Sequence, residues 1–165
     1  MALDVQRYIG KSTGNSRIVV ERGPVSNFAK AVKDDSPIYQ NAEAAKAAGF
    51  ANIPAPPTWA FAMANWGAFP EAQPTSNAEG NPMAEIIQAL RDTPGMILHG
   101  EQEFEFHRPL VVGDVLLSQG KVTDVYQKDS KGKTMTFIVT ETVYSDEKSN
   151  APVVTARFNL IHRAR

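Results

Sequence analysis

The chain has 165 residues, of which 42% are hydrophobic, so we expect a single globular domain over residues 1–165 with a core of its own. Its 17 basic and 18 acidic residues give a net charge of -1, which argues against nucleic acid and against an anionic membrane surface as partners. It contains no cysteine, which excludes disulfides and thiolate metal ligands, and its N-terminus lacks the profile of a signal peptide; we expect a cytoplasmic protein with no metal or other cofactor.

The first part of the sequence favours one strand and then helices. A strand is expected at residues 17–21, and a helix begins at Gly23-Pro24, where apolar residues recur at the spacing of one helix face: Val25, Phe28, Ala29 and Val32. An alanine-rich helix follows over residues 41–48, with Asn41 as its N-cap and Gly49 as its stop.

The segment from Trp59 to Trp66 is apolar on nearly every side. A helix without a polar face has to be enclosed by its own domain, and eight residues are too few to span a bilayer. Pro56 and Pro57 hold the incoming chain extended, and Thr58 is the expected N-cap. The pattern therefore predicts a helix buried at the centre of the fold.

The next stretch, Ala68 to Asn81, is rich in Pro, Gly, Ser and Asn and predicts a flexible flap or a lid. A further helix opens at Pro82, and Asp92-Thr93-Pro94-Gly95 ends it. From Met96 onward the hydrophobic period becomes two, which predicts a half-buried strand.

Three more strands are expected at residues 115–126, 134–144 and 152–162, joined by polar turns. Helices followed by consecutive hairpin strands indicate an antiparallel α+β domain. The simplest arrangement is one sheet curled around the buried helix.

Five short motifs follow one another along the chain, at residues 33–39, 44–50, 55–59, 104–110 and 113–116. In sequence and in order they resemble motifs of the MaoC-like, (R)-specific enoyl-thioester hydratases and dehydratases. The resemblance covers most of the chain. It implies a single hot-dog fold, in which a curved antiparallel sheet wraps around one long helix, and an acyl thioester of CoA or acyl carrier protein as ligand.

In that family an Asp and a His five positions later hold one water molecule, and the His moves the proton. Asp34 matches the acid in this chain, but Tyr39 stands where the His is expected. A phenol has an unperturbed pKa of about 10 and is not a base near neutral pH. Pro57 aligns with a Gly whose N–H would polarise the thioester carbonyl, and proline has no N–H. The catalytic positions Asp34 and Tyr39 are therefore degenerate.

These departures are similar to those of the first subunit of the mycobacterial-type (3R)-hydroxyacyl-ACP dehydratase and of the N-terminal half of double hot-dog hydratases. In such proteins one hot dog shapes the acyl tunnel while its partner supplies the catalytic Asp and His. The resemblance implies a hot-dog dimer, homodimeric or heterodimeric. The candidate substrate-binding residues are Pro56, Thr58, Trp59, Met63 and Trp66.

Other interpretations remain open. The large side chains of the 59–66 segment can be ordinary core, Asp34 can be a turn residue at a helix end, and Tyr39 can be a core aromatic. The chain can also be a homodimeric acyl-thioester binding or assembly module without chemistry. A third alternative is a self-sufficient hydratase or thioesterase that uses another base, such as His99 or a carboxylate.

Overall fold

The structure is a computed structural model that describes residues 6–67, 69, 71, 75–77, 81–130 and 132–164. These residues form a fold built on one six-stranded antiparallel sheet. The strand order is β2-β1-β4-β5-β6-β3. The strands are β1 (Ser12–Val19), β2 (Thr75–Asn77), β3 (Gly95–Phe106), β4 (Val115–Ser130), β5 (Lys133–Asp146) and β6 (Pro152–Ala164). The predicted α+β class is confirmed. The expected consecutive hairpins hold for β4, β5 and β6, but β3 pairs with β6 and not with β4, because the chain crosses to the other side of the sheet between β3 and β4.

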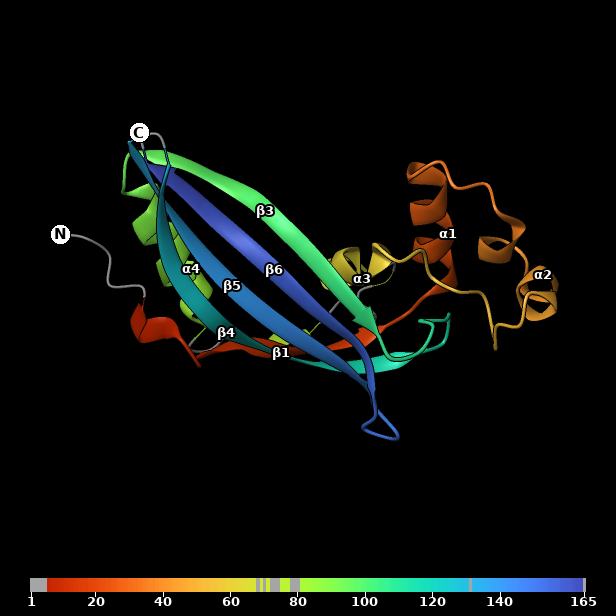
Figure 1. The fold of residues 1–165 in the computed structure, drawn as a ribbon. Helices are drawn as coiled ribbons and strands as arrows, with labels where there is room; N and C mark the ends of the chain where they lie inside the picture. The colour runs from red at the N-terminus through yellow and green to blue at the C-terminus, as the bar shows by residue number, and fades with distance from the viewer. Residues whose placement is uncertain are drawn as a thin grey trace.

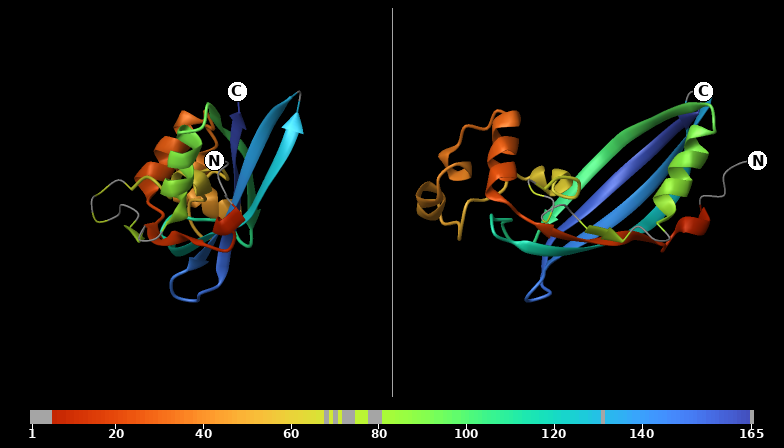
Figure 2. Two further views of the ribbon diagram at one scale, coloured as in Figure 1. Left: turned by 90° about the vertical axis from the view of Figure 1, so that its left-hand side faces the viewer. Right: turned by 180° about the vertical axis from the view of Figure 1, so that it is seen from behind.

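The helices lie on one side of the sheet or beyond its end. They are α1 (Arg22–Ala31), α2 (Ala42–Ala47), α3 (Trp59–Ala62) and α4 (Pro82–Arg91), with short 3-10 turns η1 (Gln6–Tyr8) and η2 (Pro37–Tyr39). Helices α3 and α4 lie against the same face of the curved sheet, while α1 and α2 project past one end of it (Figures 1 and 2). The chain thus has a sheet body and a helical overhang.

Two apolar clusters fill the space between sheet and helices. The first is centred on Trp59 and Met63 of the α3 region and includes Ile18 of β1 and Val154 of β6. The second surrounds Ile86 and Leu90 of α4; its sheet residues are Val122, Val125, Ile138 and Leu160. Each half of the concave face is therefore covered by its own short helix.

The predicted long helix from Trp59 to Trp66 is wrong in length. Helix α3 ends at Ala62, a turn follows, and α4 covers the rest of the face where one helix was expected. The prediction of complete enclosure is also wrong, because Phe61 is 46% and Trp66 41% exposed. A helix that lies on one side of a single sheet has an outer face, and no described part of this chain covers it.

The two predicted helix caps have different outcomes. Asn41 caps α2 as expected, since its side-chain oxygen accepts hydrogen bonds from the N–H groups of Glu43 and Ala44 at 2.8 and 3.0 Å. The prediction for Thr58 is wrong: the residue has φ -74° and ψ -6°, and its side chain makes no capping bond. Thr58 already has helical backbone angles, whereas a capping residue has an extended conformation.

The predicted flap at residues 68–81 is only partly described. Its residues 75–77 form β2, which pairs with β1. The lid interpretation otherwise falls on residues outside the described part of the chain. Within the part that the structure does describe, no helix has both the length and the apolar content to cross a bilayer.

Strand β3 is more exposed than its alternating pattern predicts. It lies at the edge of the sheet, and within the described part of the chain it pairs only with β6. Met96 is 60% and Leu98 37% exposed, and the register shifts between His99 and Glu101, which marks a β-bulge. An edge strand has no neighbour on its outer side, so half of its backbone hydrogen-bonding groups are available for another strand.

Candidate functional site

A pocket of about 460 Å³ opens between the helical overhang and the loop that follows β3. One wall comes from residues near η2 and the proline-rich entry, and the other from the end of β3 and the residues after it. The lining residues are Ile38, Tyr39, Phe50, Pro54, Ala55, Pro57, Phe106, His107, Arg108, Pro109 and Leu110. Most of them are apolar, which suits an uncharged ligand segment.

Backbone hydrogen bonds connect the two walls. Ala55 N–H donates to the carbonyl of Leu110, and Val112 N–H donates to the carbonyl of Ile53, each at 2.8 Å. These bonds flank the isolated bridge between Pro54 and Val111. The proline-rich entry is therefore fixed against the loop after β3, although more than fifty residues separate them in the sequence.

Asp34 stabilises the turn after α1 through hydrogen bonds of its backbone and of its side chain. Lys33 takes a left-handed conformation with φ 59°, and Asp34 N–H donates to the carbonyl of Ala29 at 2.9 Å, which closes the helix end. The Asp34 carboxylate then accepts a hydrogen bond from Ser36 N–H at 3.1 Å. This geometry supports the interpretation of Asp34 as a turn residue.

Tyr39 is the last residue of the η2 turn; it is half-buried and lines the pocket. Burial raises the pKa of the Tyr39 phenol above its ordinary value, and the negative charge of Asp34 raises that pKa further. The fold thus keeps Asp34 and Tyr39 as neighbours. The phenol stays protonated at neutral pH and cannot accept a proton there.

The five candidate substrate-binding residues do not line this pocket. Pro56 is buried and Thr58 exposed. Trp59 and Met63 are within the core, and Trp66 packs edge-to-face on Trp59 with ring centroids 5.6 Å apart. Among the described atoms, the buried indole N–H of Trp59 has no hydrogen-bond partner. Trp59 and Met63 thus belong to the layer between α3 and the sheet, and the entry residues that reach the pocket are Pro54, Ala55 and Pro57.

Two polar residues of the pocket, His107 and Arg108, could not be identified as site residues from the sequence. A ring nitrogen of His107 lies 3.0 Å from the hydroxyl oxygen of Thr155. The Arg108 guanidinium donates to both carboxylate oxygens of Asp114, at 2.8 and 3.0 Å. Both residues occur in the 104–110 motif, which indicated the family but carried no sign that this loop faces Tyr39.

His99, the base named for a self-sufficient enzyme, does not line the pocket. Its ring lies 4.6 Å from that of Phe158 and 5.4 Å from that of Phe61, between β6 and α3. Among the residues that the structure describes, no three His, Asp or Glu side chains are grouped so that they could hold a metal ion.

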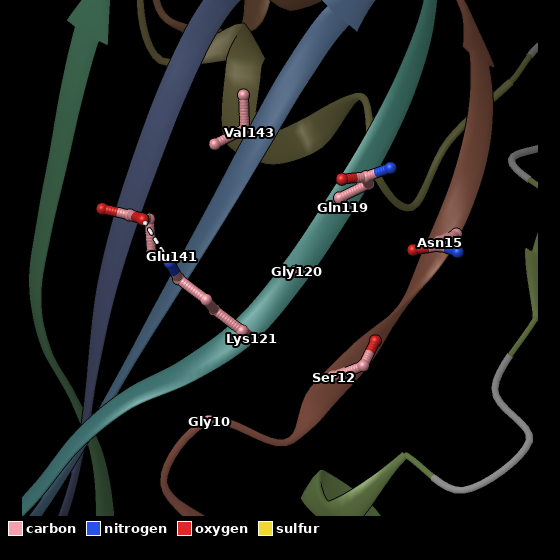
Figure 3. A pocket seen from close by; sticks show the side chains of 8 residues that line it. All are labelled: Gly10, Ser12, Asn15, Gln119, Gly120, Lys121, Glu141 and Val143. Carbon is pink, nitrogen blue, oxygen red and sulfur yellow. Dashed lines mark ion pairs between the residues drawn. The ribbon is translucent and has the colours of Figure 1, made fainter.

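A second, polar hollow of about 340 Å³ lies over β1, β4 and β5 (Figure 3). Its described lining residues include two charged ones, Lys121 and Glu141, which form an ion pair at 3.4 Å. The remaining lining residues are Gly10, Ser12, Asn15, Gln119, Gly120 and Val143. This hollow contains none of the family motifs, so the pocket beside Tyr39 is the candidate site.

A curved antiparallel sheet with helices on one face, and an Asp-containing turn beside a pocket, define the hot-dog hydratases and dehydratases. The family model described as "FAS1-like, dehydratase domain region" matches residues 7–156, and the chain belongs to this family. The resemblance seen in the motifs is thereby confirmed.

Two relatives illustrate the range of the family. The chain is 32% identical over 164 residues to a UPF0336 protein of Saccharopolyspora erythraea, covering 99% of this chain and 93% of the relative. It is 29% identical over 164 residues to the "Probable enoyl-CoA hydratase alpha subunit" of Thermomonospora curvata, covering 95% of this chain and 50% of that protein.

Solved structures show the same fold. The ChsH1-ChsH2 complex from Mycobacterium tuberculosis contains a chain with a TM-score of 0.72 and 23% identity, covering 92% of this chain and 82% of that one. The HadBC (3R-hydroxyacyl-ACP dehydratase) complex from the same organism gives 0.64 and 22%, covering 91% and 95%. At these identities the likeness concerns the fold alone.

Proposed function

We propose that this chain is the acyl-thioester-binding subunit of an (R)-specific enoyl-CoA hydratase or (3R)-hydroxyacyl-ACP dehydratase, and that a partner hot dog supplies the catalytic Asp and His. The observation that carries the proposal is Tyr39. The pocket is retained, but a phenol whose pKa is raised by burial and by Asp34 occupies the position of the catalytic imidazole. A pocket in which a phenol stands at the family's proton-transfer position suits a subunit that shapes the substrate channel.

The open edge of the sheet supports a hot-dog partner. Strand β3 presents its unpaired side along twelve residues, and exposed apolar side chains lie on it and on the α3 region next to it. A long edge of this kind is normally paired or covered. Two of the structural neighbours are described as two-component complexes, HadBC and ChsH1-ChsH2. Since the chain has no cysteine, we place the assembled enzyme in the cytoplasm.

The test is hydration of short trans-2-enoyl thioesters by the purified chain alone and after mixing with a hot-dog chain that carries an intact Asp-x4-His motif. We expect no appreciable turnover by the chain alone and turnover by the mixture. Tyr39→His should not create an efficient enzyme, because Pro57 has no N–H to polarise the carbonyl. Turnover by the chain alone that Asp34→Asn abolishes would refute the partner-dependent function.

The alternative of a binding or assembly module has support from Asp34, whose carboxylate is held by the Ser36 N–H in a turn. Ligand binding and turnover, measured together, distinguish such a module from a subunit of a hydratase. If the chain binds a non-hydrolysable acyl thioester analogue and its Tyr39→Trp variant does not, while no partner confers turnover, the module is correct. His107→Gln tests the alternative of a self-sufficient enzyme, because His107 is the imidazole that lines the pocket: any turnover by the chain alone that uses this base should be lost in the variant.

A further inference from the structure

Three glutamates form a row on one face of the edge strand β3. Glu101, Glu103 and Glu105 alternate along β3 and are exposed. Arg157 of β6 binds Glu103 at 2.9 Å and Glu105 at 3.5 Å, but the same guanidinium also binds Glu141 at 3.0 Å. Glu141 also pairs with Lys121 at 3.4 Å, whereas Glu101 accepts a hydrogen bond from the neutral amide of Asn159. Among the described ion pairs, Arg157 is thus the one cation that contacts the row of three glutamates, and the row keeps an excess of negative charge.

The bulge between His99 and Glu101 gives this face of β3 a second, apolar part. On β6 the residues Arg157, Asn159, Ile161 and Arg163 alternate and so share one face. Their partners on β3 are Glu103, Glu101, Leu98 and Met96, in that order. The same face of the edge strand thus reads Met-Leu before the bulge and Glu-Glu-Glu after it.

A β3 strand with this pattern is not complementary to the β3 strand of a second copy of the chain. In a symmetric antiparallel pair of β3 strands, residue i of one copy faces residue j of the other, and the reverse holds. A register centred near Gln102 or Glu103 places glutamates opposite glutamates, and like charges that face each other across a strand pair are destabilising. A register centred at the bulge places Glu103 and Glu105 opposite Leu98 and Met96 and so sets charge against apolar side chains.

We propose that the glutamate row selects, as the partner of β3, a different hot-dog chain whose edge strand carries Lys or Arg at alternate positions, and that it disfavours pairing between two copies of this chain. The inference rests on the proposed hot-dog partnership and adds to it the charge of the partner's edge. Opposite charges across a strand pair are favourable, and they also fix the register of the two strands.

The test needs no natural partner. The variant E101K/E103K/E105K converts the row into a basic one, so an equimolar mixture with the wild-type chain recreates the proposed complementarity. Sedimentation velocity at low salt should give a dissociation constant for the mixed dimer at least about tenfold lower than for either chain alone, which corresponds to about 1.4 kcal/mol. The mixed dimer should weaken at about 0.5 M salt, because screening reduces interactions between exposed charges.

Two controls keep the result interpretable. D35K/E43K reverses exposed charges on the overhang, away from β3, and should give no mixed dimer with the wild-type chain. E101Q/E103Q/E105Q removes the charge without placing lysines beside Arg157, and it should self-associate more strongly than the wild type. This variant tests the inference even if the triple lysine variant fails to fold. Hydrogen exchange should show new protection of β3 amides in the mixed dimer.

The outcomes separate this inference from the partnership itself. A wild-type homodimer as tight as the mixed dimer, with β3 protected in both, overturns the charge selection and leaves hot-dog pairing intact. Folded variants that show no association in any combination, and no gain for the glutamine variant, overturn the inference together with pairing through β3.

Discussion

Replacing Arg108 with Met removes the charge that holds the second wall of the pocket while keeping most of the side-chain stem. Arg108 makes two parallel bonds to Asp114, donates to the carbonyl of Pro109 at 3.0 Å, and lies 3.7 Å from Asp146. Asp114 in turn accepts the N–H of Val111 at 2.9 Å. The pair thus organises the turn between β3 and β4, from which the pocket residues project.

The burial of the two partners sets the magnitude of the effect. The Arg108 side chain is 37% exposed, but the Asp114 side chain is only 11% exposed. Exposed pairs contribute up to about 1 kcal/mol, whereas breaking a fully buried pair costs about 3–5 kcal/mol. Because solvent screens one partner here, we expect Arg108→Met to lower the free energy of unfolding by about 2 kcal/mol. For a chain of this length that corresponds to a fall in melting temperature of about 4–8 °C.

Thermal unfolding followed by circular dichroism near neutral pH measures this loss, and a double-mutant cycle with Asp114→Asn isolates the coupling between the two side chains. Arg17→Met is the matched control, because Arg17 forms a similar ion pair with Glu147 in which both side chains are more exposed. It should cost less than Arg108→Met. Equal losses for the two arginines would show that burial of Asp114 does not determine the strength of the pair.

Three further predictions concern burial, capping and the acyl channel. Burial raises the pKa of Tyr144 to about 12 against about 10 in the unfolded chain, so the stability that its protonated form contributes is complete below about pH 10 and is lost as the pH rises toward 12. By linkage this loss is on the order of 3 kcal/mol, and Tyr144→Phe should remove this part of the pH dependence in alkaline melts. Asn41→Ala should cost about 1 kcal/mol, because the N–H groups of Glu43 and Ala44 lose their acceptor, whereas an unchanged denaturant midpoint would mean that water replaces the cap. Met63 is fully buried and lies outside the pocket beside Tyr39, so Met63→Trp tests whether the proposed acyl tunnel extends as far as α3. If it does, the complex with its partner should accept shorter acyl chains, at an overpacking cost of about 1–3 kcal/mol; an unchanged preference in a folded variant would show that Met63 is core only.

The sequence determined those features that depend on near neighbours. Hairpin strands could be predicted from period-two patterns and polar turns, and Asn41 could be identified as a cap because capping involves residues two and three positions away. The degenerate pair Asp34 and Tyr39 was also visible, since both residues belong to one short motif. Such features need no knowledge of what packs against them.

The tertiary structure decided the rest, because these features depend on contacts between distant segments. Helix α3 ends at Ala62, and Phe61 and Trp66 are partly exposed because the sheet covers only one side of this segment; the local apolar pattern does not reveal either feature. The pocket joins Tyr39 and Pro57 to a loop at residues 106–110, and only strand pairing brings these segments together. The same holds for β3: its alternation is typical of a half-buried strand, but its place at the edge of the sheet follows from which strands pair, and this leaves the glutamate row open to a partner.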